Sequence, residues 1–97
     1  MPSYIMLHKY TQAGIEKVKD TPQRIERAKE IFKSVGGEIK QIHFVFGEYD
    51  MVLVAEAPSD EAMGKAVLMI TRAGMATLRT LKAFSEAEGI AITEGLP

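Results

Sequence analysis

The sequence has 97 residues, enough for one domain with a single modest core, and its 46% hydrophobic and 26% charged residues are typical of a soluble globular protein. A formal net charge of −1 without a basic block argues against nucleic-acid binding, and no apolar run approaches the roughly 20 residues that cross a bilayer. Cysteine is absent, which excludes disulfides, and the first residues lack the features of a secretion signal. We therefore expect one cytoplasmic domain over residues 1–97, with no cofactor and with neither membrane nor nucleic acid as a partner.

The first part of the chain predicts a strand followed by a helix. The segment Tyr4 to Tyr10 alternates as a strand does, although both of its faces are largely apolar. A helix is predicted to begin with Thr21 as its cap and Pro22 in the first helical position, where the missing N–H is no loss. Apolar residues at helical spacing form its buried stripe, while its charged residues, Arg24 among them, are expected to be solvated. Gly36-Gly37 ends the helix.

The stretch from Ile39 to Ala57 predicts a β-hairpin. Two runs of β-branched and aromatic residues flank Gly47-Glu48, and glycine at the first central position suits a two-residue type II′ turn. Such a turn pairs the following residues on one side of the sheet: Phe46 with Tyr49, Phe44 with Met51, Ile42 with Leu53, and Lys40 with Ala55. The other side is partly polar, yet it holds Ile39 and three valines, so we expect it to be half-buried.

The last part of the chain predicts a second helix and a fourth strand. Ser59 is the expected cap of a helix that starts with two acidic residues, which are favourable near the positive end of the helix dipole. Gly74 ends this helix, and the strand runs from Ala76 to Phe84. The segment from Ser85 to Pro97 predicts a short helical piece and then a tail that is mobile from about residue 89.

The element order βαββαβ predicts an α+β ferredoxin-like sandwich. Right-handed crossovers place both helices on one face of a four-stranded antiparallel sheet, which leaves the other face bare in a monomer. We assign to that bare face the apolar residues Tyr4, Met6, Val52, Val54, Leu78 and Phe84. Because an apolar patch of this extent normally marks an interface, the sequence predicts a homodimer or higher homo-oligomer, paired as a dimeric α+β barrel.

Three collinear segments resemble the GYD domain family, small bacterial and archaeal proteins named for a Gly-x-Tyr-Asp turn. The turn is Gly47 to Asp50, the upstream segment is Thr11 to Pro22, and the downstream segment is Thr80 to Glu88. The resemblance covers the chain from about Tyr4 to Glu88 and implies a dimeric ferredoxin-like fold, but no activity. Lys82 departs from the arginine expected there, which weakens the transfer of a bidentate anion contact.

Tyr49 and Asp50, beside the turn, have two interpretations. In the structural one, the Tyr49 ring packs beside Phe46 while Asp50 fixes the hairpin or a neighbouring loop. In the functional one, Asp50 projects into a cleft as a general base or ligand contact. His43 faces Val52 across the hairpin, so Asp50 is its diagonal neighbour, and a histidine oriented by a carboxylate is suited to act as a general base. His43 and Asp50 are therefore the candidate catalytic residues.

His8, Tyr49 and Lys82 are the candidate ligand contacts. If the even-numbered residues of the first strand form the open face, His8 lies on the same side as His43. Two histidines and a carboxylate are also a set that binds metal ions, but a half-buried polar cluster at the dimer interface is favoured and no metal is predicted. Lys82 is more often a solvated charge than an anion anchor.

These observations favour a homodimer that binds a small molecule in a pocket between sheet and helices or between two sheets. One alternative is a cofactor-free monooxygenase-like or isomerase-like enzyme that uses His43 and Asp50, which rests on analogy of fold. Another is a structural assembly module. The sequence leaves open whether the protein is an enzyme.

Overall fold

The computed structural model describes all 97 residues, as four strands and their connecting helices. The elements in chain order are β1 (Ser3–Tyr10), α1 (Gln12–Glu16), η1 (Val18–Asp20), α2 (Thr21–Ser34), β2 (Glu38–Phe44), β3 (Met51–Glu56), α3 (Asp60–Thr71), β4 (Ala76–Ala83) and α4 (Glu86–Glu94). None of the helices is both long and apolar enough to span a membrane.

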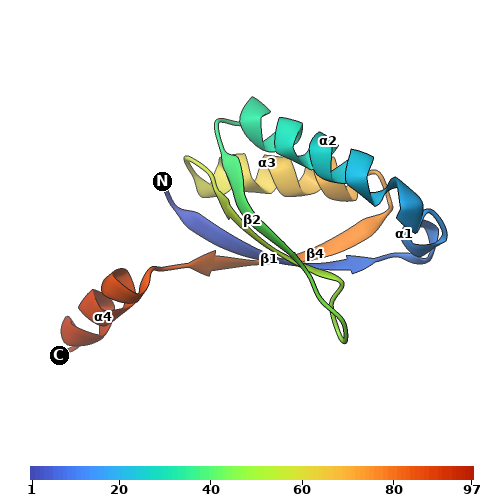
Figure 1. The fold of residues 1–97 in the computed structure, drawn as a ribbon. Coiled ribbons are helices and arrows are strands. Elements are labelled where there is room, and N and C mark those ends of the chain that lie inside the picture. The colour runs from blue at the N-terminus through green and yellow to red at the C-terminus, as the bar shows by residue number, and fades with distance from the viewer.

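The four strands form one antiparallel sheet in the order β2-β3-β1-β4. Helices α2 and α3 lie side by side on one face of this sheet, and the opposite face is uncovered (Figure 1). The predicted ferredoxin-like α+β arrangement is confirmed. The pairing of two copies into a barrel stays a prediction.

Of the two helix caps predicted from the sequence, Ser59 is confirmed and Thr21 is not. Ser59 caps α3, since its hydroxyl accepts a hydrogen bond from the Ala62 N–H at 3.1 Å. Ser85 and Glu88 form a capping box at the start of α4. The cap predicted at Thr21 is wrong. Thr21 is already inside α2, and its buried hydroxyl lies 2.7 Å from the Tyr10 hydroxyl instead.

The core lies between the sheet and the two covering helices. Its largest fully buried side chains are Phe32 of α2, Met6 of β1 and Met63 of α3. The assignment of Tyr4, Met6 and Leu78 to the open face is therefore wrong. In the β1–β3 register Met6 pairs with Leu53, and this places the even-numbered residues of β1 on the helix side.

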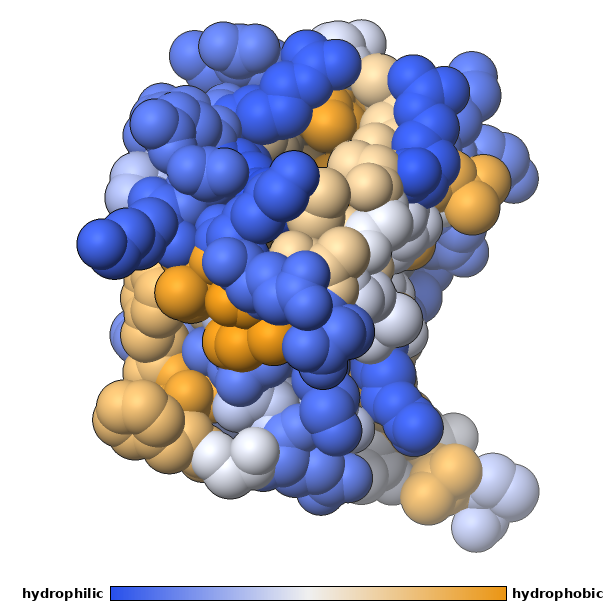
Figure 2. All heavy atoms as spheres, turned by 90° about the vertical axis from the view of Figure 1, so that its right-hand side faces the viewer, coloured by the Kyte–Doolittle hydropathy of each residue, from blue (hydrophilic) through white to orange (hydrophobic).

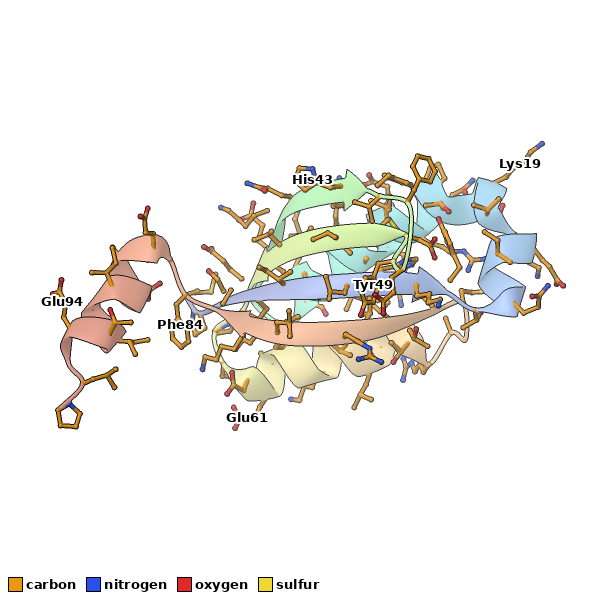
Figure 3. All side chains as sticks on the ribbon, turned by 90° about the horizontal axis from the view of Figure 1, so that it is seen from below. Lys19, His43, Tyr49, Glu61, Phe84 and Glu94 are labelled. Carbon is orange, nitrogen blue, oxygen red and sulfur yellow. The ribbon has the colours of Figure 1, made fainter.

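The open face carries a different apolar set. Val52 and Val54 lie there as predicted, accompanied by the odd-numbered residues of β1 and by the end of β4. The set is Ile5, Leu7, Val52, Val54, Leu81 and Ala83. Phe84 lies beyond the end of β4, where it is exposed at the junction with α4 (Figure 3).

The hairpin register is confirmed near the turn and wrong further away. Phe44 pairs with Met51 and Ile42 with Leu53 as predicted. An irregularity in β2 then pairs Ile39, and not Lys40, with Ala55. A bulge adds one residue to one strand, so it moves Ile39 to the helix side, where it packs against the core.

The C-terminal helix α4 stands away from the rest of the molecule. It continues the line of β4 beyond the sheet, and the molecule is 51 Å along its longest axis (Figure 1). Ile90 and Ile92 on this helix are about half exposed, at 47% and 51%. The predicted helical piece is present, and the mobility of the tail stays a prediction.

Candidate functional site

A cavity of about 640 Å³ lies between the helix side of the sheet and helices α2 and α3. Fourteen of its 19 lining residues are hydrophobic, and this size and character are typical of pockets for small molecules. Methionines from β1, β3, α3 and the α3–β4 connection contribute to the wall, and their flexible side chains adapt to irregular shapes. We call this cavity the chamber.

His8 is a buried, titratable residue of the chamber wall. It is 8% exposed, and its Nδ1 atom has no hydrogen-bond partner. Its ring meets the Tyr10 ring edge-on, with the ring centroids 4.8 Å apart. Burial lowers the pKa of His8 below 6.5, and the Asp50 carboxylate offsets this only in part. The imidazole is therefore neutral at pH 7.

Tyr10 and Thr21 connect the end of β1 to the start of α2 beside His8. Their hydroxyl groups lie 2.7 Å apart, and the Tyr10 backbone N–H donates to Asp50 Oδ2 at 2.8 Å. Asp50 in turn is anchored through its own backbone, since its N–H donates to the His8 carbonyl at 2.8 Å. The hairpin base, β1 and α2 thus hold one another at this end of the chamber.

The charged residues that line the chamber are all arginines. They are Arg24 and Arg27 of α2 and Arg72 at the end of α3, and no aspartate or glutamate shares the wall. The Arg24 Nη1 atom is buried without a hydrogen-bond partner, while its Nη2 atom lies 3.9 Å from the exposed Asp20. In Figure 2, which views the end of the molecule where α1 lies, apolar surface is bordered by hydrophilic residues. The chamber therefore combines apolar walls with positive charge.

The candidate catalytic residues His43 and Asp50 do not contact each other. His43 is exposed on the open face of the edge strand β2, with its ring nitrogen 3.3 Å from Gln41 Oε1 (Figure 3). The Asp50 carboxylate is bonded to the Tyr10 N–H, which is the structural interpretation of this residue. The Asp50 carboxylate acts electrostatically on His8, whose pKa it raises against the larger effect of burial. The predicted catalytic role of this pair stays a prediction without a connecting contact.

The three candidate ligand contacts lie in three different places. His8 lies inside the chamber, on the opposite side of the sheet from His43, so the expected shared face is wrong. Tyr49 is part of the hairpin loop that projects below the sheet (Figures 1 and 3). No group of three or more histidine, aspartate or glutamate side chains is placed to bind a metal ion.

Lys82 belongs to a second, smaller cavity of about 340 Å³ near the start of α3. Its Nζ atom lies 3.3 Å from Asp60 Oδ1, which also accepts the hydrogen bond of the buried Tyr4 hydroxyl. This hydrogen bond to Asp60 raises the pKa of Tyr4 to about 12, and burial adds to the effect. The bonds from Tyr4 and Lys82 lower the pKa of Asp60. The lysine is thus an ion-pair partner within the protein.

Sequence reasoning missed Arg24, Tyr10 and Thr21 as parts of the site. A signal for Arg24 was present, because it stands four and seven residues before Ala28 and Ile31 and so shares their helix face. Arg24 was nevertheless predicted to be solvated, because arginine side chains are mostly exposed. No comparable signal existed for the Tyr10–Thr21 contact, which joins two elements through the tertiary fold.

Comparison with known proteins identifies similar chains. The family model described as GYD domain matches residues 4–93. The chain is 32% identical over 92 residues to a Thermus thermophilus protein named "Glutamine synthetase and cystathionine beta-lyase binding protein", covering 94% of this chain and 97% of that one.

Two solved structures share the fold. A protein of unknown function from Rhodopseudomonas palustris has a TM-score of 0.53 at 16% identity, covering 87% of this chain and 84% of that one. The de novo designed protein Ferredog-Diesel has a TM-score of 0.51 at 25% identity, covering 84% and 85%.

Proposed function

The chain belongs to the GYD domain family, and we propose that it is a binding protein whose chamber takes up a small molecule. The observation that carries this proposal is the pair of buried polar atoms without partners, His8 Nδ1 and Arg24 Nη1, in the wall of one cavity. Buried polar atoms nearly always have a hydrogen-bond partner, and one that lacks it costs about 1–3 kcal/mol. A bound molecule that supplies both partners removes this cost.

The test of this proposal is an NMR titration of the isotope-labelled protein with octanoate, octanol and octylamine. Binding in the chamber shifts the methyl signals of wall residues such as Met51 and Met69, while the exposed Leu68 on the outer side of α3 is the internal reference. If none of the three probes moves the wall signals at millimolar concentration, the proposal is wrong. Equal shifts at Leu68 would also contradict it, because they would indicate unspecific adsorption.

The same proposal includes a homodimer formed through the open face of the sheet. The strand registers place Val54, Ile5 and Leu81 side by side there, with Leu7 and Val52 in the adjoining row. A face that is in contact only with water is usually more polar than this one. A second copy, related by a twofold axis, would cover the patch with the same residues.

Light scattering tests the dimer with a matched pair of variants. Leu81→Asp places a charge in the open face, where Leu81 is 50% exposed, and is expected to give a monomer. Leu68→Asp on α3, at a site that is 68% exposed, is expected to leave the dimer intact. A wild-type protein that is monomeric at micromolar concentration, or a dimer that survives Leu81→Asp, would contradict this part.

A second candidate function, binding to a metabolic enzyme, is favoured by the name of the Thermus relative. The exposed hairpin residues Phe44 and Phe46, at 65% and 104%, offer aromatic groups of the kind that anchor protein interfaces. Biolayer interferometry with purified glutamine synthetase and cystathionine β-lyase tests this function. Phe46→Ser is expected to weaken binding at least tenfold, whereas Phe84→Ser at the other end of the sheet is expected to leave it unchanged. If the protein binds neither enzyme, this second function is ruled out for glutamine synthetase and cystathionine β-lyase.

A further inference from the structure

The polar groups of the chamber gather at one end. His8 packs on Tyr10, the Tyr10 hydroxyl contacts Thr21, and Thr21 lies one helical turn before Arg24. Apart from Arg27 and Arg72, the remaining wall has only apolar side chains, such as Ile42 and the methionines of β3 and α3. A ligand that satisfies this cavity therefore has two unlike ends, one polar and one apolar.

The charge at the polar end has one sign. Arginine stays protonated at every pH that a folded protein experiences, and the wall contains no acidic side chain to balance Arg24. The neighbouring Asp20 is 59% exposed and its oxygen is 3.9 Å from Arg24 Nη2, so this pair is weak and leaves Nη1 free. Arg27 is paired at 3.7 Å with Glu30, and both of these side chains are exposed. A cationic head group would be repelled, and a neutral one would leave the guanidinium uncompensated.

Resting on the proposed small-molecule function, we infer that the ligand is a monocarboxylate with an apolar body, such as a medium-chain fatty acid, whose carboxylate is held by Arg24 beside His8. The planar guanidinium fork of Arg24 matches the planar geometry and the two oxygens of a carboxylate. The aliphatic body then contacts the apolar remainder of the wall. A chamber of about 640 Å³ has room for such a molecule.

Isothermal titration calorimetry with octanoate, octanol and octylamine distinguishes the ligand class from the broader function. Wild-type protein is expected to bind octanoate at least tenfold more tightly than octanol and to bind octylamine least. Arg24→Met keeps the aliphatic stem of Arg24 while it removes the charge, and is expected to weaken octanoate about tenfold, or about 1.4 kcal/mol, without changing octanol. The matched control is Arg79→Met, at an exposed position on β4 outside the chamber wall. It is expected to leave the affinities for octanoate and octanol unchanged.

The outcomes separate the two proposals. If octanol binds as tightly as octanoate, or if both arginine variants behave alike, the monocarboxylate inference is wrong and the small-molecule function stands. If none of the three molecules binds, both are wrong.

A measurement on the wild-type protein avoids any folding defect of Arg24→Met. An anion held beside His8 favours the imidazolium, so octanoate is expected to raise the NMR-detected pKa of His8, and octanol is not. The charged and titratable groups around this ring, namely Asp50, Tyr10 and the three chamber arginines, are the same in both experiments. If the pKa of His8 is the same with octanoate as with octanol, the inference is overturned.

Discussion

The substitution Gly14→Ala is predicted to destabilise the protein strongly, because this glycine in α1 is in direct contact with the α3–β4 connection. A Cβ atom built at Gly14 would lie 1.9 Å from the Met75 carbonyl oxygen and 2.9 Å from its carbonyl carbon. Both contacts are with backbone, which cannot rotate away as a side chain does. The Met75 oxygen is also fixed, since it accepts a hydrogen bond from the Thr11 N–H at 3.1 Å. The added methyl group therefore forces the two segments apart.

The expected loss follows from these contacts. Overpacking costs about 1–3 kcal/mol, and the strained Thr11–Met75 hydrogen bond adds about 1 kcal/mol. The higher helix propensity of alanine returns at most about 1 kcal/mol. A net loss of about 2–3 kcal/mol corresponds to a fall in Tm of roughly 10–20 °C for a domain of this size.

Thermal and urea unfolding of Gly14→Ala and Gly64→Ala measure this difference. Gly64 is the matched control, because it lies exposed in α3 and a Cβ there meets no atom within 4 Å. Its replacement by alanine is expected to stabilise the protein by about 0.5–1 kcal/mol. A Gly14→Ala protein as stable as the wild type would refute the close approach of α1 to Met75. Because Met75 also lines the chamber, the variant should lose octanoate binding along with stability.

Three further predictions concern titration and the hairpin anchor. Tyr4 is expected to ionise near pH 12 in an ultraviolet titration, so the stability that its raised pKa contributes is complete below pH 10 and is lost between pH 10 and 12. Asp60→Asn should shift this ionisation to lower pH, and an unchanged titration curve would contradict the Tyr4–Asp60 contact. His8 has a lowered pKa, so the unfolded chain takes up more protons and stability falls as pH drops below 6.5. The urea midpoint should therefore decrease from pH 7 to pH 5 in the wild type, and less so in His8→Leu. Asp50→Ala should cost about 1–3 kcal/mol by leaving the Tyr10 N–H without its acceptor, while Asp50→Asn, which retains an oxygen, should cost less; equal losses in urea unfolding would refute the anchoring role.

Much of the fold was predictable because its local signals agree with each other. The Ser59 cap, the positive-φ glycines Gly36 and Gly74 at the helix ends, and the turn at Gly47 each mark a boundary that the structure shows. Two helices between strands of the right length then leave few topologies, and the ferredoxin-like one satisfies the right-handed crossover rule. Ile42 opposite Leu53 followed from the turn length alone.

The face assignment of β1 failed for a physical reason. Alternation tells which residues share a face, but it does not tell which face meets the helices when both are apolar. Tyr4 and Met6 are larger than Ile5 and Leu7, yet only the pairing of Met6 with Leu53 decides the direction. The bulge in β2 was equally invisible, because an extra residue leaves no signature in a strand of mixed polarity.

The site was harder to predict than the fold because its parts are brought together only by tertiary structure. His8 and Tyr10 come from the central strand, and Thr21 and Arg24 come from the first turn of α2. His43 and Asp50 attracted attention because they are near in sequence and chemically reactive. The Asp50 carboxylate, however, is bonded to β1. Residues that are close along a hairpin, such as His43 and Asp50, thus need not share a site. The residues of the candidate site are those that line one cavity.

The ambiguity of β1 in the sequence has its own explanation in the two proposed binding surfaces. In a two-layer protein whose sheet faces water, the central strand would be apolar on its helix side and polar on the other. Here Met6 and His8 face the chamber, whereas Ile5 and Leu7 face outward between Val54, Val52 and the end of β4. A strand needs apolar groups on both sides when one side borders a ligand cavity and the other is covered by a partner. The feature that made the faces of β1 indistinguishable is thus the one that a dimeric binding protein requires.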